Sequence, residues 1–165
     1  MTLPEENWPS LLGTPLCTAD FRVEGAIMPL GKSPWAERRV GYVTGGSFAG
    51  DRLRGAILPG GGNWSMAGTA PDGNAVGTFD ARVIWQTDDG AMIYVTYTGR
   101  TAIPPDVGAA FRAGQNDVDP ARYYIRIAPV FEVADERYAW LNGILAVGIG
   151  HRMPWGIRHF IYAIG

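Results

Sequence analysis

The sequence predicts a mainly β protein: a single closed antiparallel β-barrel with one short helix. Twenty-three glycines and twelve prolines interrupt the 165-residue chain, charged residues make up only 18%, and aromatic residues reach 12%. This composition is typical of many short strands joined by tight turns around an aromatic-rich interior. A chain of this length is expected to form one domain with a sizeable core.

Strand-like segments rich in β-branched and aromatic residues follow one another, each closed by glycine or proline. We expect an irregular lead-in over 1–14 and one barrel domain over 15–165, with no repeat or linker. The segments that read as strands lie within 15–34, 37–50, 51–59, 76–87, 91–99, 123–133, 138–150 and 157–165. About eight to ten strands favour a closed barrel over an open sheet.

Two local patterns are specific. The sequence Asp88-Asp89-Gly90 predicts a hairpin turn between the strands on either side of it. The segment PPDVGAAFRAG, residues 104–114, predicts the helix, because prolines stand at its start and Gly114 follows its last turn.

Alternation along the strands divides their side chains between two faces. One face is apolar and the other mixes polar with aromatic groups. In 78–86 the mixed face holds Thr78, Asp80, Arg82, Ile84 and Gln86, and in 92–98 it holds Met92, Tyr94, Thr96 and Thr98. In 138–146 we expect Tyr138, Trp140, Asn142, Ile144 and Ala146 to share a face.

Two architectures fit this division. The apolar face can form the core, with the mixed face in water. Alternatively the mixed face lines a ligand-holding barrel interior, and the apolar face packs against the helix or another subunit. We favour the second, because tryptophan, tyrosine and arginine among small polar groups are typical of a ligand pocket.

The stretch LPGGGNW, residues 58–64, places three glycines before Asn63 and Trp64. A phosphate-binding loop would open a helix and carry a lysine, whereas Lys32 is the only lysine of the chain. Two interpretations remain, and both can hold together. The glycines can form a bulged strand end, and the turn can bring Asn63 and Trp64 to the mouth of the barrel.

Five motifs occur in the order of one family: PGGGNW at 59–64, FDAR at 79–82, TDDGAMIYV at 87–95, YYIR at 123–126 and YAWLNGILAVGIG at 138–150. On these motifs the chain resembles domain-of-unknown-function family 3237, also called the UPF0311 proteins, over roughly residues 15–165. The resemblance implies a calycin-like or lipocalin-like antiparallel barrel with a central cavity. The family commonly has Asp before the tryptophan of the glycine turn, where this chain has Asn63. An amide cannot take up a proton, so a role that needs a carboxylate there is in question.

Asp80 and Arg82 are the candidate catalytic residues. Two residues apart on a strand, they project to one face about 6.6–7 Å apart along the chain. Arginine beside a carboxylate favours its ionised form, so Asp80 can serve as general base while Arg82 stabilises an enolate or phenolate. The alternative is a structural ion pair that only stabilises the barrel.

The candidate substrate-binding residues each have a structural alternative. Tyr94 and Asn142 can hydrogen-bond a ligand or satisfy the protein's own groups, and Trp64 and Trp140 can form apolar walls for a flat ligand or pack in the core. Arg126 adds a second cation to the cavity or lies on the surface. The full candidate set is Asn63, Trp64, Tyr94, Arg126, Trp140 and Asn142.

Several classes of function are disfavoured. A net charge of −2 argues against nucleic-acid binding, no apolar run reaches the roughly 18 residues of a membrane helix, and the N-terminus lacks a signal-peptide pattern. Neither His151 nor His159 has an identifiable partner, and no metal-ligand spacing occurs. The single Cys17 excludes an internal disulfide and reads as an inert packed thiol. We therefore expect a cytoplasmic protein without metal or cofactor.

Two functions compete. The first is a cofactor-independent enzyme, a lyase or isomerase, that performs addition–elimination, hydration, cyclisation or isomerisation of an unsaturated carbonyl or phenolic compound. The second is a protein that binds a small aromatic or lipid-like molecule without altering it. A further interpretation is a structural subunit whose apolar outer face is an interface. A homo-oligomer is also compatible with the binding protein, which does not require one.

Overall fold

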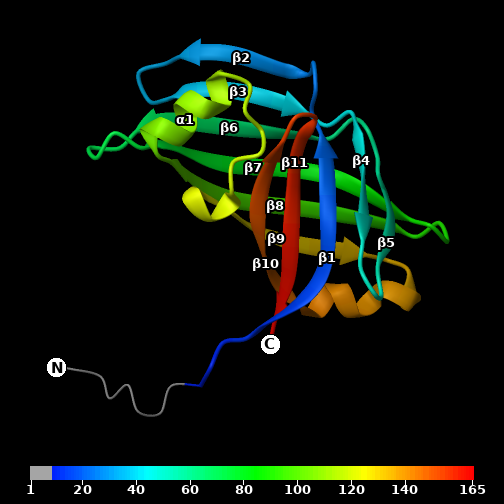
Figure 1. Ribbon diagram of the computed structural model, residues 1–165. Helices are drawn as coiled ribbons and strands as arrows, with labels where there is room; N and C mark the ends of the chain where they lie inside the picture. The colour runs from blue at the N-terminus through cyan, green and yellow to red at the C-terminus, as the bar shows by residue number, and fades with distance from the viewer. Residues whose placement is uncertain (1–8) are drawn as a thin grey trace.

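The computed structural model describes residues 9–165, and residues 1–8 of the expected lead-in lie outside that range. Eleven strands and three short helical segments make up this part of the chain (Figure 1). In order they are β1 (Gly13–Arg22), β2 (Ile27–Lys32), β3 (Glu37–Tyr42), β4 (Gly45–Ala49), β5 (Arg54–Ile57), β6 (Gly62–Thr69), β7 (Ala75–Thr87), β8 (Met92–Ile103), α1 (Pro105–Arg112), η2 (Pro120–Arg122), β9 (Tyr124–Val133), η3 (Glu136–Gly143), β10 (Leu145–Met153) and β11 (Gly156–Ile164).

Eight strands close an antiparallel barrel, which confirms the predicted fold class. The ring runs β7-β8-β9-β10-β11-β1-β4-β5 and returns to β7. Strand β7 is 13 residues long and changes partner along its length: β5 pairs with its C-terminal end, and β6 pairs with the part before it. Strands β6, β3 and β2 therefore extend the sheet beyond the barrel, as the upper layer in Figure 1 shows.

The glycine run lies where the chain passes from the β5 side of β7 to the β6 side. Gly60 adopts a φ of +104°, in the left-handed region. A Cβ on Gly61 would lie 2.5 Å from the carbonyl oxygen of Arg82, so only glycine permits this approach to β7. The run forms the turn between β5 and β6, and Asn63 and Trp64 follow it on β6.

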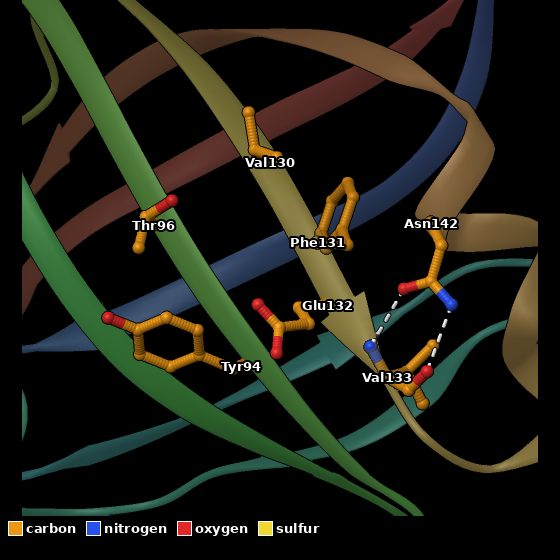
Figure 2. A pocket seen from close by; sticks show the side chains of 7 residues that line it. All are labelled: Tyr94, Thr96, Val130, Phe131, Glu132, Val133 and Asn142. Carbon is orange, nitrogen blue, oxygen red and sulfur yellow. Dashed lines mark hydrogen bonds between the residues drawn. The ribbon is translucent and has the colours of Figure 1, made fainter.

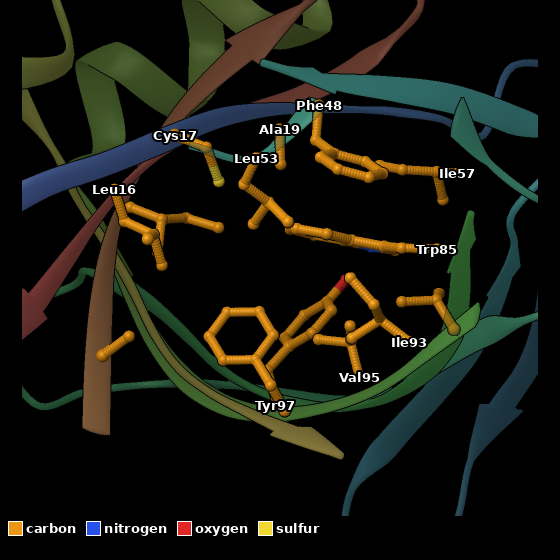
Figure 3. Packing of buried hydrophobic residues seen from close by; sticks show 14 of the residues in the cluster. Leu16, Cys17, Ala19, Phe48, Leu53, Ile57, Trp85, Ile93, Val95 and Tyr97 are labelled. Atoms are coloured by element: carbon orange, nitrogen blue, oxygen red, sulfur yellow. The ribbon is translucent and has the colours of Figure 1, made fainter. Parts of the chain in front are cut away.

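The barrel interior is a packed apolar core (Figure 3). Trp85 and Ile93 are fully buried, and Trp85 stacks on Phe48 with ring centroids 4.5 Å apart. The apolar faces of β7 and β8 thus point inward, and the mixed faces point outward. The division of side chains was predicted correctly, but our expectation that the mixed face lines the interior is wrong. Burying charged and hydroxyl groups without partners is costly, whereas burying indole and aliphatic groups is favourable.

His159 lies fully buried in this core, surrounded by the rings of Phe21, Phe79 and Tyr97. Both of its ring nitrogens lack a hydrogen-bond partner within the described chain. Burial lowers the pKa of His159 to about 3, so the imidazole is neutral near pH 7. Burial also raises the pKa of the Cys17 thiol to about 12, which keeps it protonated and unreactive.

The predicted DDG hairpin and helix are both present. Gln86 pairs with Met92 across the turn, and Gly90 adopts a φ of +92°. The helix is α1, whose Val107 and Phe111 pack with Tyr123 and Ile125 in a second buried cluster beside the main core.

The expected strand over 138–150 is wrong in its first half. Residues 136–143 form the 3-10 helix η3, and only 145–153 form a strand, β10. The Asp135 carboxylate accepts the backbone N–H of Arg137 at 3.0 Å and so caps the start of η3. The alternation that we assigned to Trp140 and Asn142 therefore does not exist, because these residues follow a helical path.

The turn between β7 and β8 anchors η3. The Asp89 carboxylate accepts hydrogen bonds from the hydroxyls of Thr87 (2.6 Å) and Tyr138 (3.0 Å) and forms an ion pair with Arg137 at 2.8 Å. These contacts, the Thr87 hydrogen bond foremost, lower the pKa of Asp89. The network fixes the segment that carries Asn142 against the hairpin.

Candidate functional site

The outer face of β7, β8 and β9 carries four of the eight residues that we predicted for the site, namely Asp80, Arg82, Tyr94 and Arg126. Directly opposite residues on these strands form rows, because the register of both pairings is continuous. Four consecutive rows are Thr78–Arg100–Arg126, Asp80–Thr98–Ala128, Arg82–Thr96–Val130 and Ile84–Tyr94–Glu132. Neighbouring rows are about 6.6–7 Å apart along the strands.

Two shallow depressions lie on this face. The first, about 310 Å³, is lined by Asp80, Ala81, Arg82, Thr96, Tyr97, Thr98, Ala128 and Val130. The second, about 410 Å³, is lined by Tyr94, Thr96, Val130, Phe131, Glu132, Val133 and Asn142 (Figure 2). Thr96 and Val130 belong to both, so the depressions adjoin each other. Their volumes fall in the range that binds small molecules.

Asp80 and Arg82 form an ion pair with a carboxylate–guanidinium distance of 3.2 Å. Their side chains are 54% and 55% exposed, respectively. An ion pair this exposed contributes at most about 1 kcal/mol to stability. The barrel therefore does not depend on the pair, and both groups can reach a ligand in the first depression.

Asn63 holds the backbone of β7 at Asp80. The β6–β7 ladder lacks two pairs between Asn63–Ala81 and Met66–Thr78, although the register is the same on both sides of this gap. In this gap the side-chain oxygen of Asn63 accepts the backbone N–H of Asp80 at 3.0 Å. A carboxylate could accept the same hydrogen bond, so the Asn in place of the family's usual Asp is compatible with this positioning role.

Trp64 lies on β6 and lines neither depression. The β6–β7 register places it on the same face as Asp80, and its ring lies over Gly62, the residue opposite Arg82. The indole is 39% exposed, so it offers an apolar wall beside the ion pair.

The second depression combines the polar groups of Tyr94, Thr96, Glu132 and Asn142 with the apolar side chains of Val130, Phe131 and Val133 (Figure 2). Tyr94 and Glu132 are directly opposite each other on β8 and β9, and Val130 lies next to them. The amide of Asn142 is occupied by the protein itself: it accepts from the backbone N–H of Val133 and donates to its carbonyl, both at 2.9 Å. Asn142 therefore closes the end of β9, and a hydrogen bond from it to a ligand stays a prediction.

Two further predicted residues line neither depression. Arg126 lies one row from Asp80, with its guanidinium 4.7 Å from the centroid of the Tyr124 ring. Trp140 lies on η3, where the Arg52 guanidinium stacks 4.0 Å from its ring centroid. The structure thus places Asp80 and Arg82 in the first depression and Tyr94 and Asn142 in the adjoining one, with Arg126 one row from Asp80, and it leaves Trp140 elsewhere.

Sequence reasoning missed the residues that complete the face. Thr96 and Thr98 had been placed on the mixed face but not in the site, and Arg100, Val130 and Glu132 had not been considered. Counting outward from the DDG turn would have placed Thr98 opposite Asp80. The alternation in 124–132 would have placed Glu132 on the face of Arg126.

No group of three or more potential metal ligands of the His, Cys, Asp or Glu types occurs within residues 9–165. Over the same range, no helix is both long and apolar enough to cross a membrane.

The fold and this face define an antiparallel β-barrel that is filled by its own core and carries a polar, partly aromatic outer surface. The chain belongs to the family described as "Protein of unknown function (DUF3237)", whose model matches residues 13–164. A UPF0311 protein of Rhodopseudomonas palustris is 30% identical over 128 residues, which cover 78% of this chain and 80% of that protein.

Solved structures share the fold over nearly the whole chain. The structure of that R. palustris protein superposes with a TM-score of 0.85 at 26% identity, covering 96% of this chain and all of the other. A β-barrel-like protein of Acinetobacter baumannii gives 0.79 at 31% identity, covering 98% and 100%. A structure described as an enzyme from Penicillium herquei gives 0.62 at 24% identity, covering 99% and 100%, and at this identity it shows the fold alone.

Proposed function

We propose that the protein is a cofactor-independent enzyme that performs acid–base chemistry on a small unsaturated carbonyl or phenolic compound. The observation that carries the proposal is the Asp80–Arg82 ion pair in the first depression, beside two hydroxyls and an apolar floor. The reaction takes place on the outer face of β7–β9 rather than inside the barrel.

The two charged groups have complementary roles in this proposal. The Asp80 carboxylate removes a proton from the substrate, and the Arg82 guanidinium stabilises the enolate or phenolate that forms. Thr96 and Thr98 supply hydroxyls that can orient the substrate, and Ala128 and Val130 form the surface on which it lies. Return of the proton to another carbon completes an isomerisation. Departure of a leaving group that takes up the proton completes an elimination, and the reverse reaction with water is a hydration. Addition of a phenolate oxygen to the unsaturated carbonyl of the same molecule, followed by protonation of the resulting enolate, completes a cyclisation, so the enzyme is a lyase or isomerase.

The fold is compatible with catalysis, since one barrel of this fold is described as an enzyme. That likeness extends to the fold alone, so the proposed reaction rests on the residues of this chain.

The competing proposal is a small-molecule binding protein without turnover. It is favoured by the shallowness of the depressions and by the exposure of Tyr94 (39%) and Val130 (49%), which leave the face open to water. A homo-oligomer would cover such apolar groups and is compatible with both proposals. Light scattering that finds a monomer at all concentrations would exclude it.

The test compares wild type, Asp80→Asn and Asp106→Asn. Asp106 lies in the first turn of α1 and forms an exposed ion pair with Arg122, so its variant is a matched control for the loss of a paired carboxylate. All of these proteins are first screened by thermal shift against phenols, enones, fatty acids and nucleotides, where saturation at 100 times Kd adds about 2.7 kcal/mol. Compounds that bind are then followed by proton NMR in D2O for exchange and conversion.

We expect Asp80→Asn to lower turnover by about 10²–10⁴-fold while Kd changes by less than about threefold, because only the proton acceptor is lost. Asp106→Asn should leave both unchanged. Turnover that survives in Asp80→Asn contradicts the mechanism. Ligand that binds and is recovered unchanged after prolonged incubation with wild type supports the binding protein instead.

A further inference from the structure

Arg100 and Arg126 lie directly opposite each other on β8 and β9, in the row next to Asp80–Thr98–Ala128. Like charges directly across a strand pair repel each other and destabilise the sheet. A pair of this kind is stabilised when an anion lies between the two guanidinium groups.

The described protein supplies no such anion. Among residues 9–165 the ion pairs involve Arg82, Arg122, Arg137 and Arg158, and neither Arg100 nor Arg126 has a carboxylate within 4.0 Å. The nearest row's carboxylate, Asp80, is paired with Arg82. Two positive charges on one face therefore have no counter-charge within this part of the chain.

Both guanidinium groups are oriented and still have free donors. The Nη1 atom of Arg100 donates to the carbonyl of Gly99 at 2.8 Å, and Nη1 of Arg126 donates to the carbonyl of Ile125 at 2.9 Å. The Tyr124 ring lies against Arg126 at 4.7 Å. Since a guanidinium carries five N–H donors, most of them remain available to a planar oxyanion.

We propose that Arg100 and Arg126 bind a carboxylate of the substrate, so that the substrate class is a small unsaturated or phenolic acid. This inference rests on the proposed function for the reaction but not for the binding. A carboxylate at the arginine row puts the body of the ligand over Thr98 and Ala128, about 6.6–7 Å further along the strands. It then lies beside Asp80 in the first depression.

The probe is 4-hydroxycinnamate, and its methyl ester, which lacks the carboxylate charge, is the control ligand. Binding of each is measured by NMR titration of ¹⁵N-labelled protein that includes the arginine Nε–H signals. The variants are Arg100→Gln/Arg126→Gln and, as a control with the same loss of charge, Arg22→Gln/Arg54→Gln. Neither Arg22 nor Arg54 has a carboxylate partner within residues 9–165.

We expect wild type to bind the acid roughly tenfold more tightly than the ester, about the effect of one charge-assisted hydrogen bond. The Arg100/Arg126 double variant should bind both equally, and the control should behave as wild type. Added salt should weaken binding of the acid alone. Arg100→Lys/Arg126→Lys, which keeps the charge but loses the bidentate geometry, should fall between wild type and the double glutamine variant.

Equal binding of acid and ester by wild type, absence of binding, or unchanged preference in the double variant would each overturn the anion site. The outcome is separable from that of the proposed enzyme. An acid that binds at the arginine pair but is not converted leaves this site intact and removes the catalytic proposal. Conversion of neutral compounds by a protein that shows no preference for the acid removes this site and leaves the catalytic proposal intact.

Discussion

The interior of the barrel and the outer face of β7–β9 are built from the same strands and serve different purposes. Inside, Trp85, Ile93 and His159 are fully buried, and the rings of Trp85 and His159 both lie near the ring of Phe21. Outside, Asp80 and Arg82 are about half exposed and make one contact with each other. Each of the strands β7–β9 therefore uses one face for the stability of the barrel and leaves the other face free for chemistry. Substitutions on the two faces should therefore have different consequences.

The largest effect on stability is expected for Trp85→Ala. It removes a fully buried indole that stacks on Phe48, and large-to-small changes of this kind cost about 3–5 kcal/mol. Urea unfolding measures the loss. Gln86→Ala, the next residue but on the outer face, should stay within about 1 kcal/mol. If Trp85→Ala lowered the free energy of unfolding only slightly, the interior would not be the stabilising core.

Acid should destabilise the interior through His159. Its pKa in the folded protein is about 3, below the roughly 6.5 of an exposed histidine, so the unfolded state binds a proton first as pH falls. The stabilisation is fully present above about pH 6.5 and is lost as pH falls toward 3, at a limiting slope of about 1.4 kcal/mol per pH unit. Urea unfolding measured at several pH values from 7.5 to 4 gives the free energy of unfolding at each pH. This free energy should fall less steeply with falling pH in His159→Phe than in wild type. Equal slopes would show that His159 is not the group that titrates.

The smallest loss of stability is expected for Asp80→Asn. Asp20→Asn, which removes a less exposed ion pair, provides the comparison. Asp20 lies directly opposite Arg158 on β1 and β11 and accepts two hydrogen bonds of 2.7 Å, which raise the pKa of Arg158. Losing this pair should cost about 1–2 kcal/mol, whereas losing the exposed Asp80–Arg82 contact should cost less than about 1 kcal/mol. Thermal unfolding of both variants checks the order. An equal or larger loss for Asp80→Asn would make its pair a structural staple and weaken the catalytic proposal.

Part of the site was predictable because its geometry is local. Asp80 and Arg82 share a face through the two-residue period of a strand, and the DDG turn sets Tyr94 on the strand beside them. Asn142 and Trp140 were misplaced because the capping of η3 by Asp135 overrides the apparent alternation. The role of Asn63 at Asp80 depends on two missing pairs in the β6–β7 ladder, which a single sequence does not reveal.

The sequence by itself determined the class of fold, the hairpin, the helix and the division of each strand into two faces, because these follow from turn chemistry and from the alternation of side chains. Only the tertiary structure decided which face is inside and which strands meet. Closing eight strands leaves one enclosed surface, and it takes the side chains whose burial is most favourable. Partner choices such as the change from β6 to β5 along β7 depend on contacts between distant segments. The pairing of β8 with β9, which are separated by α1 and η2, likewise places Arg126 opposite Arg100 on the side that remains in water.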